Sequence, residues 1–438
     1  MTQRPSIPAA SSYCLANATV PASLTGDAPL PTAGDGLACA DILVRNGRVA
    51  ALLPPGEGTL AAAPIVNLDR GMVMPGFIDI HTHLDKGHIW PRRSNPDGRF
   101  ESALEAVGQD RAANWSASDV EARMDFALRC AFAHGTTAIR THLDSRDAQT
   151  RISWPVFARM RERWAGRIAL EASPLFPIDL ALDDAHMADI LAMVGDHGAT
   201  LGAVTFRYPQ LDDGLDRLFR IASERGWNLD FHVDETLDPL ARSLGLIAEK
   251  AIHYRFQGSI VAGHCCSLAV QPDDEAKRTI DRVAEARVAV VSLPMCNMYL
   301  QSRESGVTPR RRGVTALHEL KARGVAVMVA SDNTRDPFYA YGDLDMVEVY
   351  REATRIAHLD HPVGDWISTV TSTPASILGL EGLGTLTPGS KADLVLFRAR
   401  SWSEFLSRPW MDRVVLRAGV QCDAVAPDYR ELDEILRE

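Results

Sequence analysis

Four histidines and one aspartate stand at the ends of short apolar segments, and their side chains are typical metal ligands. His81 and His83 close GFIDIHTH, His232 lies in NLDFHVDE, His264 in SIVAGHC and Asp332 in VAVMVASDN. Side chains two residues apart on a strand share a face, so His81 and His83 would lie side by side. Imidazole nitrogen and carboxylate oxygen bind Zn²⁺ or Fe²⁺. The pattern therefore predicts a divalent metal site, with a position left open for water. The expected ligands are His81, His83, His232 and Asp332.

The segments that carry these residues belong to a series of eight strand candidates with helical patterns between them. The candidates are Gly76–His83, Thr136–Asp144, Arg167–Leu175, Leu201–Phe206, Asn228–Glu235, Ser259–Cys265, Val288–Pro294 and Val325–Asn333. Such a series predicts a (β/α)8 TIM-type barrel, whose active site lies at the carboxyl ends of the strands. A doubly wound open sheet is the alternative, but no GxGxxG opens the first helix.

Short strand patterns occur near both ends of the chain. Ala40–Gly56 contains two apolar runs joined by Asn46-Gly47, a strong hairpin signal, and Lys391–Phe397 and Asp412–Cys422 are again strand-like. We therefore expect an α/β chain in which a small β-sandwich domain is built from both termini, over 1–69 and 383–438, with the barrel over 70–382. The first 36 residues, rich in Ala, Pro, Ser and Gly, are expected to be loosely patterned.

Composition narrows the classes of partner. The net charge of −11 argues against nucleic acid and anionic membranes, which are bound by clustered Lys and Arg. No apolar run has the length of a membrane helix, and the start has no apolar core of signal-peptide length. Seven scattered cysteines without a CxxC pair indicate a reducing compartment, so we expect a cytoplasmic location and a small-molecule partner.

The order of the motifs resembles that of the amidohydrolase superfamily, and the match with its cytosine deaminase-like branch is closer. GFIDIHTH, FHVDE, AGH and SDN carry the resemblance, together with RRRGVT before the last strand and DPFYAYG after it. It extends over nearly the whole chain from about residue 40. Binuclear relatives bridge two metals with a carboxylated lysine at the end of strand four, and Leu201–Pro209 contains no lysine. The resemblance therefore implies a single metal ion.

The resemblance also implies how the reaction is divided among the residues. Asp332 binds the metal and accepts a proton from its water, Glu235 moves a proton to the ring nitrogen, and His264 orients the hydroxide. These three are the predicted catalytic residues, and His142 is expected to support the ligands without binding metal. The implied reaction is attack of metal-bound hydroxide on a C=N carbon of an aminated heterocycle, with release of ammonia.

The expected substrate contacts depart from those of cytosine deaminases. Asn333 stands where these enzymes have a second aspartate, Ile178 where they have glutamine, and Phe338 where they have tryptophan. With Trp90, these three are the predicted substrate-binding residues. A site that loses polar partners for one ring should prefer another. We therefore expect a modified pyrimidine, an isoguanine-like purine, a pterin or an aminotriazine, and not cytosine itself.

Two alternatives to deamination remain open at this stage. A relative that releases an alkylamine from an N-substituted triazine would use the same metal ligands. A barrel kept as a non-catalytic scaffold has less support, because such proteins commonly lose ligands and here the set is complete. The sequence is compatible with a homo-oligomer but shows no interface.

Overall fold

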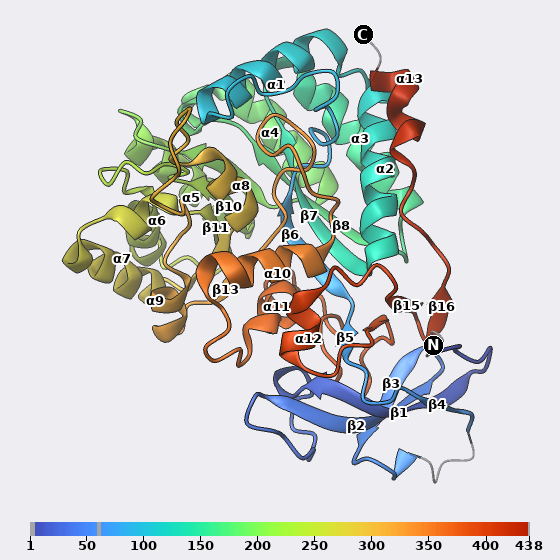
Figure 1. Ribbon diagram of the computed structural model, residues 1–438. Coiled ribbons are helices and arrows are strands. Elements are labelled where there is room, and N and C mark those ends of the chain that lie inside the picture. The colour runs from blue at the N-terminus through green and yellow to red at the C-terminus, as the bar shows by residue number, and fades with distance from the viewer. Residues whose placement is uncertain (1–4, 59–62, 437–438) are drawn as a thin grey trace. The chain divides into compact units, whose positions relative to one another are not determined.

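The computed structural model describes residues 5–58 and 63–436, and it is a mixed α/β protein (Figure 1). The chain divides into two compact units, each described here by itself. Unit 1 comprises Met1–Asp79, Arg129–Ala138 and Asp345–Ala426. Unit 2 comprises Ile80–Leu128, Ile139–Leu344 and Pro427–Glu438. The predicted domain limits after residues 69 and 382 stay a prediction.

Unit 1 contains two four-stranded sheets. The first is built from the N-terminal part of the chain alone, and the second from both its N-terminal and C-terminal parts. The first has the order β3-β2-β1-β4 and is drawn in blue in Figure 1. Its strands are β1 (Ser12–Pro21), β2 (Leu37–Arg45), β3 (Arg48–Leu53) and β4 (Ile65–Asn67). The second has the antiparallel order β16-β15-β14-β5. Its strands are β5 (Val73–Pro75), β14 (Leu394–Leu396), β15 (Val414–Arg417) and β16 (Val420–Cys422).

The first sheet confirms one expectation and corrects another. Asn46 and Gly47 both have positive φ, 49° and 75°, and join β2 to β3 as the hairpin signal predicts. The expectation of a loosely patterned start is wrong, because Ser12–Pro21 is a ten-residue strand that is mostly buried between β2 and β4. Its small residues did not stand out against the Ala- and Ser-rich composition around it. The first four residues lie outside the described part.

Buried side chains from both sheets of unit 1 form one apolar cluster. Leu15 and Ile42 come from the first sheet, and Leu394 and Leu416 from the second. The β-sandwich inferred from the sequence stays a prediction. The α-helices that lie wholly within the described part of this unit are α10 (Met346–Ala357), α11 (Ser372–Ile377) and α12 (Trp402–Ser407).

Eight further strands correspond to the eight strand candidates predicted from the sequence. They are β6 (Phe77–Thr82), β7 (Thr136–Asp144), β8 (Ala169–Leu175), β9 (Leu201–Thr205), β10 (Leu229–Val233), β11 (Ile260–His264), β12 (Val288–Ser292) and β13 (Val327–Val329). The first three form one sheet, and β9 to β13 form a parallel sheet. Parallel bridges from Pro177 to Val204 and from Thr82 to Asp332 link the two sheets at both edges. This cyclic order is consistent with the predicted TIM-type barrel.

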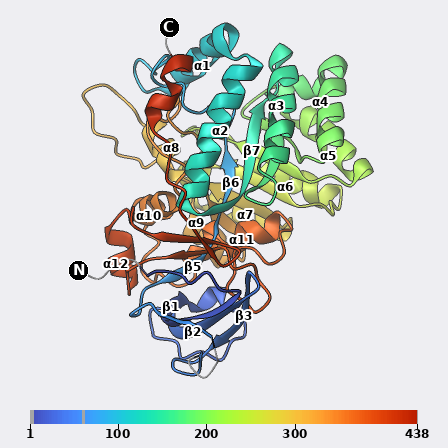
Figure 2. The same ribbon diagram turned by 90° about the vertical axis from the view of Figure 1, so that its right-hand side faces the viewer.

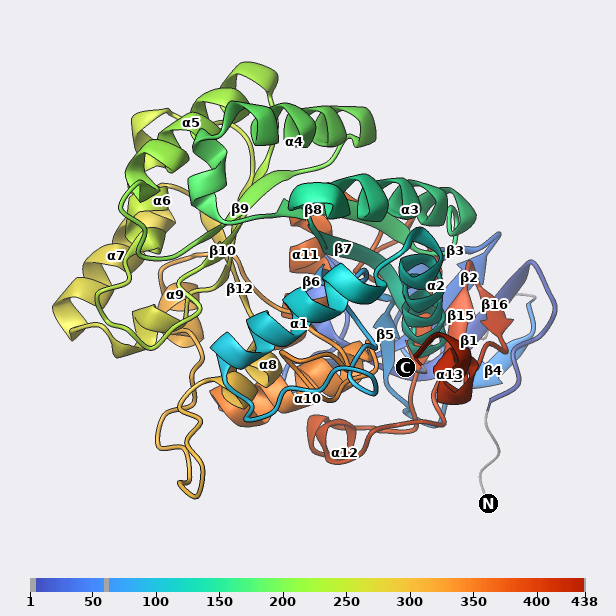
Figure 3. The same ribbon diagram turned by 90° about the horizontal axis from the view of Figure 1, so that it is seen from above.

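Helices follow these strands on the outside of the sheet. Figure 3 shows α4 to α7 outside β9, β10 and β12, and Figure 2 shows α3 and α4 side by side. The helices of this part are α1 (Phe100–Asn114), α2 (Ala117–His134), α3 (Thr150–Arg163), α4 (Asp184–His197), α5 (Leu211–Arg225), α6 (Ser243–His253), α7 (Asp273–Glu285), α8 (Pro294–Leu300), α9 (Leu317–Ala322) and α13 (Asp433–Leu436). None of the helices within the described ranges has the length and apolarity needed to cross a bilayer.

Candidate active site

Four predicted metal ligands converge at the carboxyl ends of three strands of unit 2. Nε2 of His81, near the end of β6, lies 3.1 Å from Nε2 of His232 on β10. Nε2 of His83 lies 3.4 Å from the same His232 atom and 3.1 Å from Oδ1 of Asp332, just beyond β13. His81 Nε2 and Asp332 Oδ1 are 3.6 Å apart. Three imidazole nitrogens and one carboxylate oxygen therefore face a common centre.

These separations fit a metal ion. Two ligand atoms that each lie about 2.1 Å from a tetrahedral ion are roughly 3.4 Å from each other. The observed spacings of 3.1 to 3.6 Å scatter about that value. Two unprotonated imidazole nitrogens at such distances point their lone pairs at each other, which is unfavourable unless a cation lies between them. The donor set, three imidazoles and a carboxylate, suits zinc and iron.

Backbone contacts hold the ligands in place. Nδ1 of His83 donates a hydrogen bond to the carbonyl oxygen of His142 at 3.2 Å, which leaves its Nε2 free to bind metal. The backbone N–H of Asp332 donates to the carbonyl of His81 at 2.9 Å, and the Thr82 hydroxyl donates to the carbonyl of Asp332 at 2.7 Å. Asp332 has a φ of 63°, a left-handed conformation that is uncommon for non-glycine residues.

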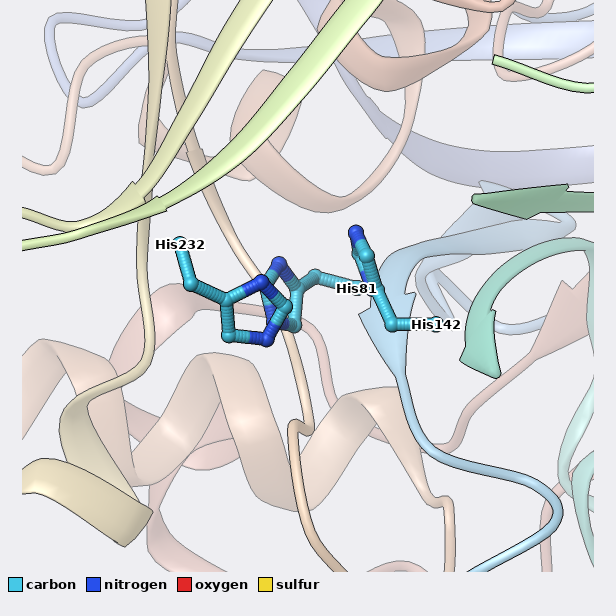
Figure 4. A group of neighbouring side chains, drawn as sticks. All are labelled: His81, His142 and His232. Atoms are coloured by element: carbon cyan, nitrogen blue, oxygen red, sulfur yellow. The ribbon is translucent and has the colours of Figure 1, made fainter. Parts of the chain in front are cut away.

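His142 lies against this group, as Figure 4 shows. Its ring centroid is 4.0 Å from that of His81 and 4.7 Å from that of His232. Its Nε2 lies 3.1 Å from Oδ1 of Asp230, and the other oxygen of that carboxylate accepts a hydrogen bond from Arg140 at 2.8 Å. One His142 nitrogen is also close enough to His81 and His232 for a shared ion. The supporting role inferred for His142 stays a prediction.

Burial and mutual repulsion keep the imidazoles neutral. Burial, followed by the neighbouring histidines, lowers the pKa of His81 and His232 well below the usual range. Burial also lowers the pKa of His83 to about 4. Burial raises the pKa of Asp332. The charge of His264 and the hydrogen bond with His83 outweigh this effect and lower that pKa to about 2. At neutral pH the four groups are therefore in the protonation state that binds metal.

The predicted acid–base residues lie beside the ligands and share a partner. Oε1 of Glu235 lies 3.5 Å from Nδ1 of His264, at the end of β11. Asn297 on α8 bridges them: its Nδ2 donates to Oε1 of Glu235 at 3.1 Å and lies 3.0 Å from His264 Nδ1. Burial, followed by the charge of Asp332, raises the pKa of Glu235 well above its ordinary value. Glu235 can therefore carry a proton near neutral pH.

A cavity of about 320 Å³ opens onto these groups. The lining residues include His83, His232, Glu235, His264 and Asp332, all of which are buried. Aromatic rings line much of the rest, namely Phe100, Phe176, Phe206, Tyr208 and Phe338. A volume in this range and aromatic walls are typical of small-molecule sites.

Two of the four predicted substrate contacts line the cavity. These are Asn333 and Phe338. The Asn333 amide already donates to Asp336 at 2.7 Å. Ile178 is fully buried and Trp90 is partly exposed, and neither is among the lining residues. As substrate-binding residues all four stay predictions.

Sequence reasoning missed several polar residues of the cavity. Lys86, Arg111, Asp144 and Arg146 line it, and Asn297 touches its acid–base pair. Asp144 ends the β7 segment, Arg146 follows it, and Asn297 follows the predicted strand Val288–Pro294, so their positions after strands were a usable signal. Arg111 lies on α1, and only the tertiary fold brings it to the site.

Fold and site together are typical of a class, that of metal-dependent hydrolases with a (β/α)8-type barrel, because the four predicted ligands lie at the carboxyl ends of its strands. The comparisons with known proteins agree. The family model described as "Amidohydrolase family" matches residues 159–420. The chain is 55% identical to a pterin deaminase of Rhizobium rhizogenes (strain K84 / ATCC BAA-868), over 98% of both chains. It therefore belongs to the amidohydrolase family.

More distant relatives extend the comparison. An N-isopropylammelide isopropyl amidohydrolase of Pseudomonas sp. (strain ADP) is 24% identical, over 82% of this chain and 88% of the relative. A crystal structure of 5-methylcytosine deaminase from Klebsiella pneumoniae with 5-fluorocytosine superposes with a TM-score of 0.81 at 20% identity, covering 95% of this chain and 98% of the other. The family match and the 55% identical relative confirm the predicted family and, at the level of class, a hydrolase of C–N bonds that deaminates a heterocycle, whereas the likeness to the solved structure bears on the fold.

Proposed function

We propose that this protein is a deaminase with one divalent metal ion, Zn²⁺ or Fe²⁺, that releases ammonia from a pterin or a closely related bicyclic heterocycle. The observation that carries the proposal is the convergence of three imidazole nitrogens and one carboxylate beside Glu235, which lines the cavity. The 55% identity to a pterin deaminase over nearly the full length supports the choice of ring. Only one metal is proposed, because Leu201–Pro209 contains no lysine that could bridge two.

The ligands of the ion would be His81, His83, His232 and Asp332. Bound there, a divalent ion supplies a water molecule whose pKa is lowered toward neutrality. Asp332, ionised because its pKa is low, accepts a proton from that water. Glu235, whose pKa is raised, would protonate the ring nitrogen as the water oxygen bonds to the neighbouring amine-bearing carbon. The proton held by Asp332 would then pass to the exocyclic amine, the C–N bond would break and ammonia would leave, and the remaining hydroxyl would return a proton to Glu235 as the carbonyl forms.

His264 would orient the attacking group. When Asn297 donates to Nδ1 of His264, the proton of that imidazole resides on Nε2, and no residue in the described part accepts a hydrogen bond from Nε2. Burial lowers the pKa of His264 to about 4, so the ring is neutral at pH 7 and donates through a single N–H. One fixed donor beside the ligands can hold the attacking oxygen in line with the substrate.

The alternative, hydrolysis of an N-alkyl group, is favoured by one observation. An isopropyl amidohydrolase acting on N-isopropylammelide aligns over 82% of the chain. The two functions share metal ligands and differ in the leaving group, so the product separates them. A cytoplasmic location also belongs to this proposal, and it is supported by seven cysteines that are all free of disulfides.

The test uses the full-length protein stripped with chelator and reloaded separately with Zn²⁺ and Fe²⁺. Pterin, cytosine and N-isopropylammelide are supplied in turn, and ammonia and isopropylamine are both quantified. We expect ammonia from pterin in a metal-dependent reaction, and little turnover of cytosine. Isopropylamine from N-isopropylammelide without ammonia from pterin would establish the alternative. A metal-loaded protein that turns over none of the three substrates would contradict both and favour a scaffold.

A further inference from the structure

Three cations line the active-site cavity, and they differ in how their charges are balanced. Lys86 is buried, with 5% of its surface exposed, and its Nζ lies 3.4 Å from Oδ1 of Asp144. Arg111 donates to the other oxygen of Asp144 at 2.7 Å and is about one-quarter exposed. The carboxylate of Asp144 thus forms ion pairs with both Lys86 and Arg111. It is the one carboxylate on this part of the cavity wall, away from Glu235 and Asp332.

Arg146 is the third cation, and its guanidinium has no ion pair or side-chain hydrogen bond with any residue in 5–58 or 63–436. It is exposed and follows β7 by two residues. Asp147 is next in the chain, yet it forms no ion pair with Arg146 in the described part. A guanidinium that lines a substrate cavity without a protein partner is free to bind a ligand anion.

The two arginines also occupy a defined place in the cavity system. Gly108, Arg111 and Arg146 line both the active-site cavity and a second cavity of about 390 Å³. They therefore stand where the two spaces adjoin, whereas His83 and Glu235 line only the first. A ring bound at the metal ligands can extend a substituent toward this junction.

We propose that the natural substrate is an aminated heterocycle with a carboxylate or phosphate substituent, and that Arg146, together with Arg111, binds this anionic group. The inference rests on the proposed function and specifies which substrates of that class the site prefers. Guanidinium groups pair with planar or tetrahedral anionic oxygens through two parallel hydrogen bonds, which fixes orientation as well as adding affinity. Arg146 and Arg111 would then be specificity-determining residues, with no part in bond breaking.

The experiment compares three substrates that share one ring and one point of attachment. They are neutral 6-hydroxymethylpterin, 6-carboxypterin and the phosphate ester of 6-hydroxymethylpterin. Ammonia release gives kcat/KM for each with the metal-loaded wild type, with Arg146→Gln and with the control Arg151→Gln. Arg151 is an exposed arginine on α3 that pairs with Asp189 and lines neither cavity.

The expected result is a wild-type preference for one or both anionic substrates. The ratio of anionic to neutral kcat/KM should fall about tenfold in Arg146→Gln and stay unchanged in Arg151→Gln. Comparison of 6-carboxypterin with the phosphate ester shows which anionic group the site binds better. If the neutral pterin is deaminated and the ratio is the same in all three proteins, the inference is overturned while the proposed function stands. If none of the pterins releases ammonia, the proposed function fails and the inference fails with it.

Discussion

At the scale of single residues, Glu235 and Asp332 show how two buried carboxylates can take opposite roles. Both lie among the same imidazoles, and their nearest oxygens, with the Cys296 sulfur, are within 4.8 Å of one another. Histidine neighbours lower the pKa of Asp332 to about 2, whereas burial and Asp332 itself raise that of Glu235. In the proposed mechanism the ionised carboxylate of Asp332 binds the metal and the carboxyl of Glu235 carries a proton. Pairs of acids whose pKa values are driven apart are characteristic of acid–base catalysis.

This division predicts the behaviour of Glu235→Gln. Glutamine keeps the size and one hydrogen bond to Asn297 but cannot carry the proton. We expect kcat on pterin to fall by about 10²–10⁴, with KM little changed, because general acid–base catalysis is worth that much. Metal content, measured by elemental analysis, should stay at the wild-type level. A variant that releases ammonia at the wild-type rate would remove Glu235 from the mechanism.

Asn297 is expected to position the acid–base pair. It contacts both Glu235 and His264, so Asn297→Ala removes two hydrogen bonds to polar partners in a buried site. We predict a fall in kcat of about 10- to 100-fold with unchanged metal content. The pH profile should shift as well, because Glu235 loses a neighbour that favours its ionised form. The control is Asn114→Ala, at a residue on α1 that donates a hydrogen bond to Asp110. This variant should leave kcat and the pH profile unchanged. An unaltered pH profile in Asn297→Ala would indicate a structural role only.

The convergence of the four proposed metal ligands could be predicted from sequence because each lies at or just after the end of a strand, and parallel strands of a barrel end at one face. Lys86 and Arg111 could not be assigned in this way. Their roles depend on Asp144, which both of them contact across the fold. The position of Asn297 after its strand was a usable signal, but on a short helix the direction of its side chain depends on local geometry that the sequence does not display.

At the scale of elements, β11 must pass unusually close to the side chain of His81 on β6. A Cβ built on Gly263 would lie 2.8 Å from Cε1 and 3.0 Å from Nδ1 of His81. Gly263→Ala should therefore displace the imidazole of a proposed metal ligand and lower metal affinity by about tenfold or more. A titration of metal-loaded protein with competing chelator measures this. Gly245→Ala on α6, where the nearest atoms are 3.7 and 3.9 Å away, is the matched control. Equal metal affinity in both variants would contradict the prediction.

The start of α10 depends on a buried ion pair within unit 1. The carboxylate of Asp345 caps the helix by accepting from the N–H of Val347 at 3.0 Å, and it accepts two hydrogen bonds from Arg413 at 2.6 and 2.5 Å. Burial raises the pKa of Asp345, but the charge and hydrogen bonds of Arg413 outweigh it, so the pKa lies below the ordinary value. Removing one partner of such a pair leaves the other charge buried.

Asp345→Asn should therefore lower the free energy of unfolding by about 3 kcal/mol at neutral pH. Because the folded pKa is depressed, the stabilisation is present above the unfolded pKa of about 3.9 and is lost as pH falls through the lower folded value. The difference between wild type and variant should consequently shrink at about pH 3. Urea midpoints at the two pH values measure it. A difference that is the same at both would show that the charge of Asp345 is not responsible.

Regular elements were predictable where a local signal was strong. The Asn46-Gly47 turn and the strand Thr136–Asp144 occur as the sequence pattern indicates. β1 was missed because its small residues do not stand out against a similar composition around it. The left-handed conformations of His264 and Asp332, with φ of 68° and 63°, could not be foreseen, because only the surrounding structure imposes them.

At the scale of the molecule, the proposed metal site joins distant parts of the chain. Thr82 and Asp332 are 250 positions apart, and a hydrogen bond and a parallel bridge hold them together. His232 comes from a third segment. An ion bound by all of them would connect both ends of the strand series, and it would bind the folded chain far better than the unfolded one. Binding of this kind stabilises the fold by mass action.

Metal removal should therefore lower the melting temperature of the whole protein. With free metal at about 100 times its Kd, the ion contributes about 2.7 kcal/mol, which corresponds to a shift of several degrees. Differential scanning calorimetry of the metal-loaded protein, with and without excess chelator, measures the shift, and added Zn²⁺ or Fe²⁺ should restore the original Tm. In His232→Asn, which lacks one proposed ligand, chelator should have a much smaller effect. If the wild-type protein melts at the same temperature with and without chelator, the proposed ligands do not bind an ion that connects these segments.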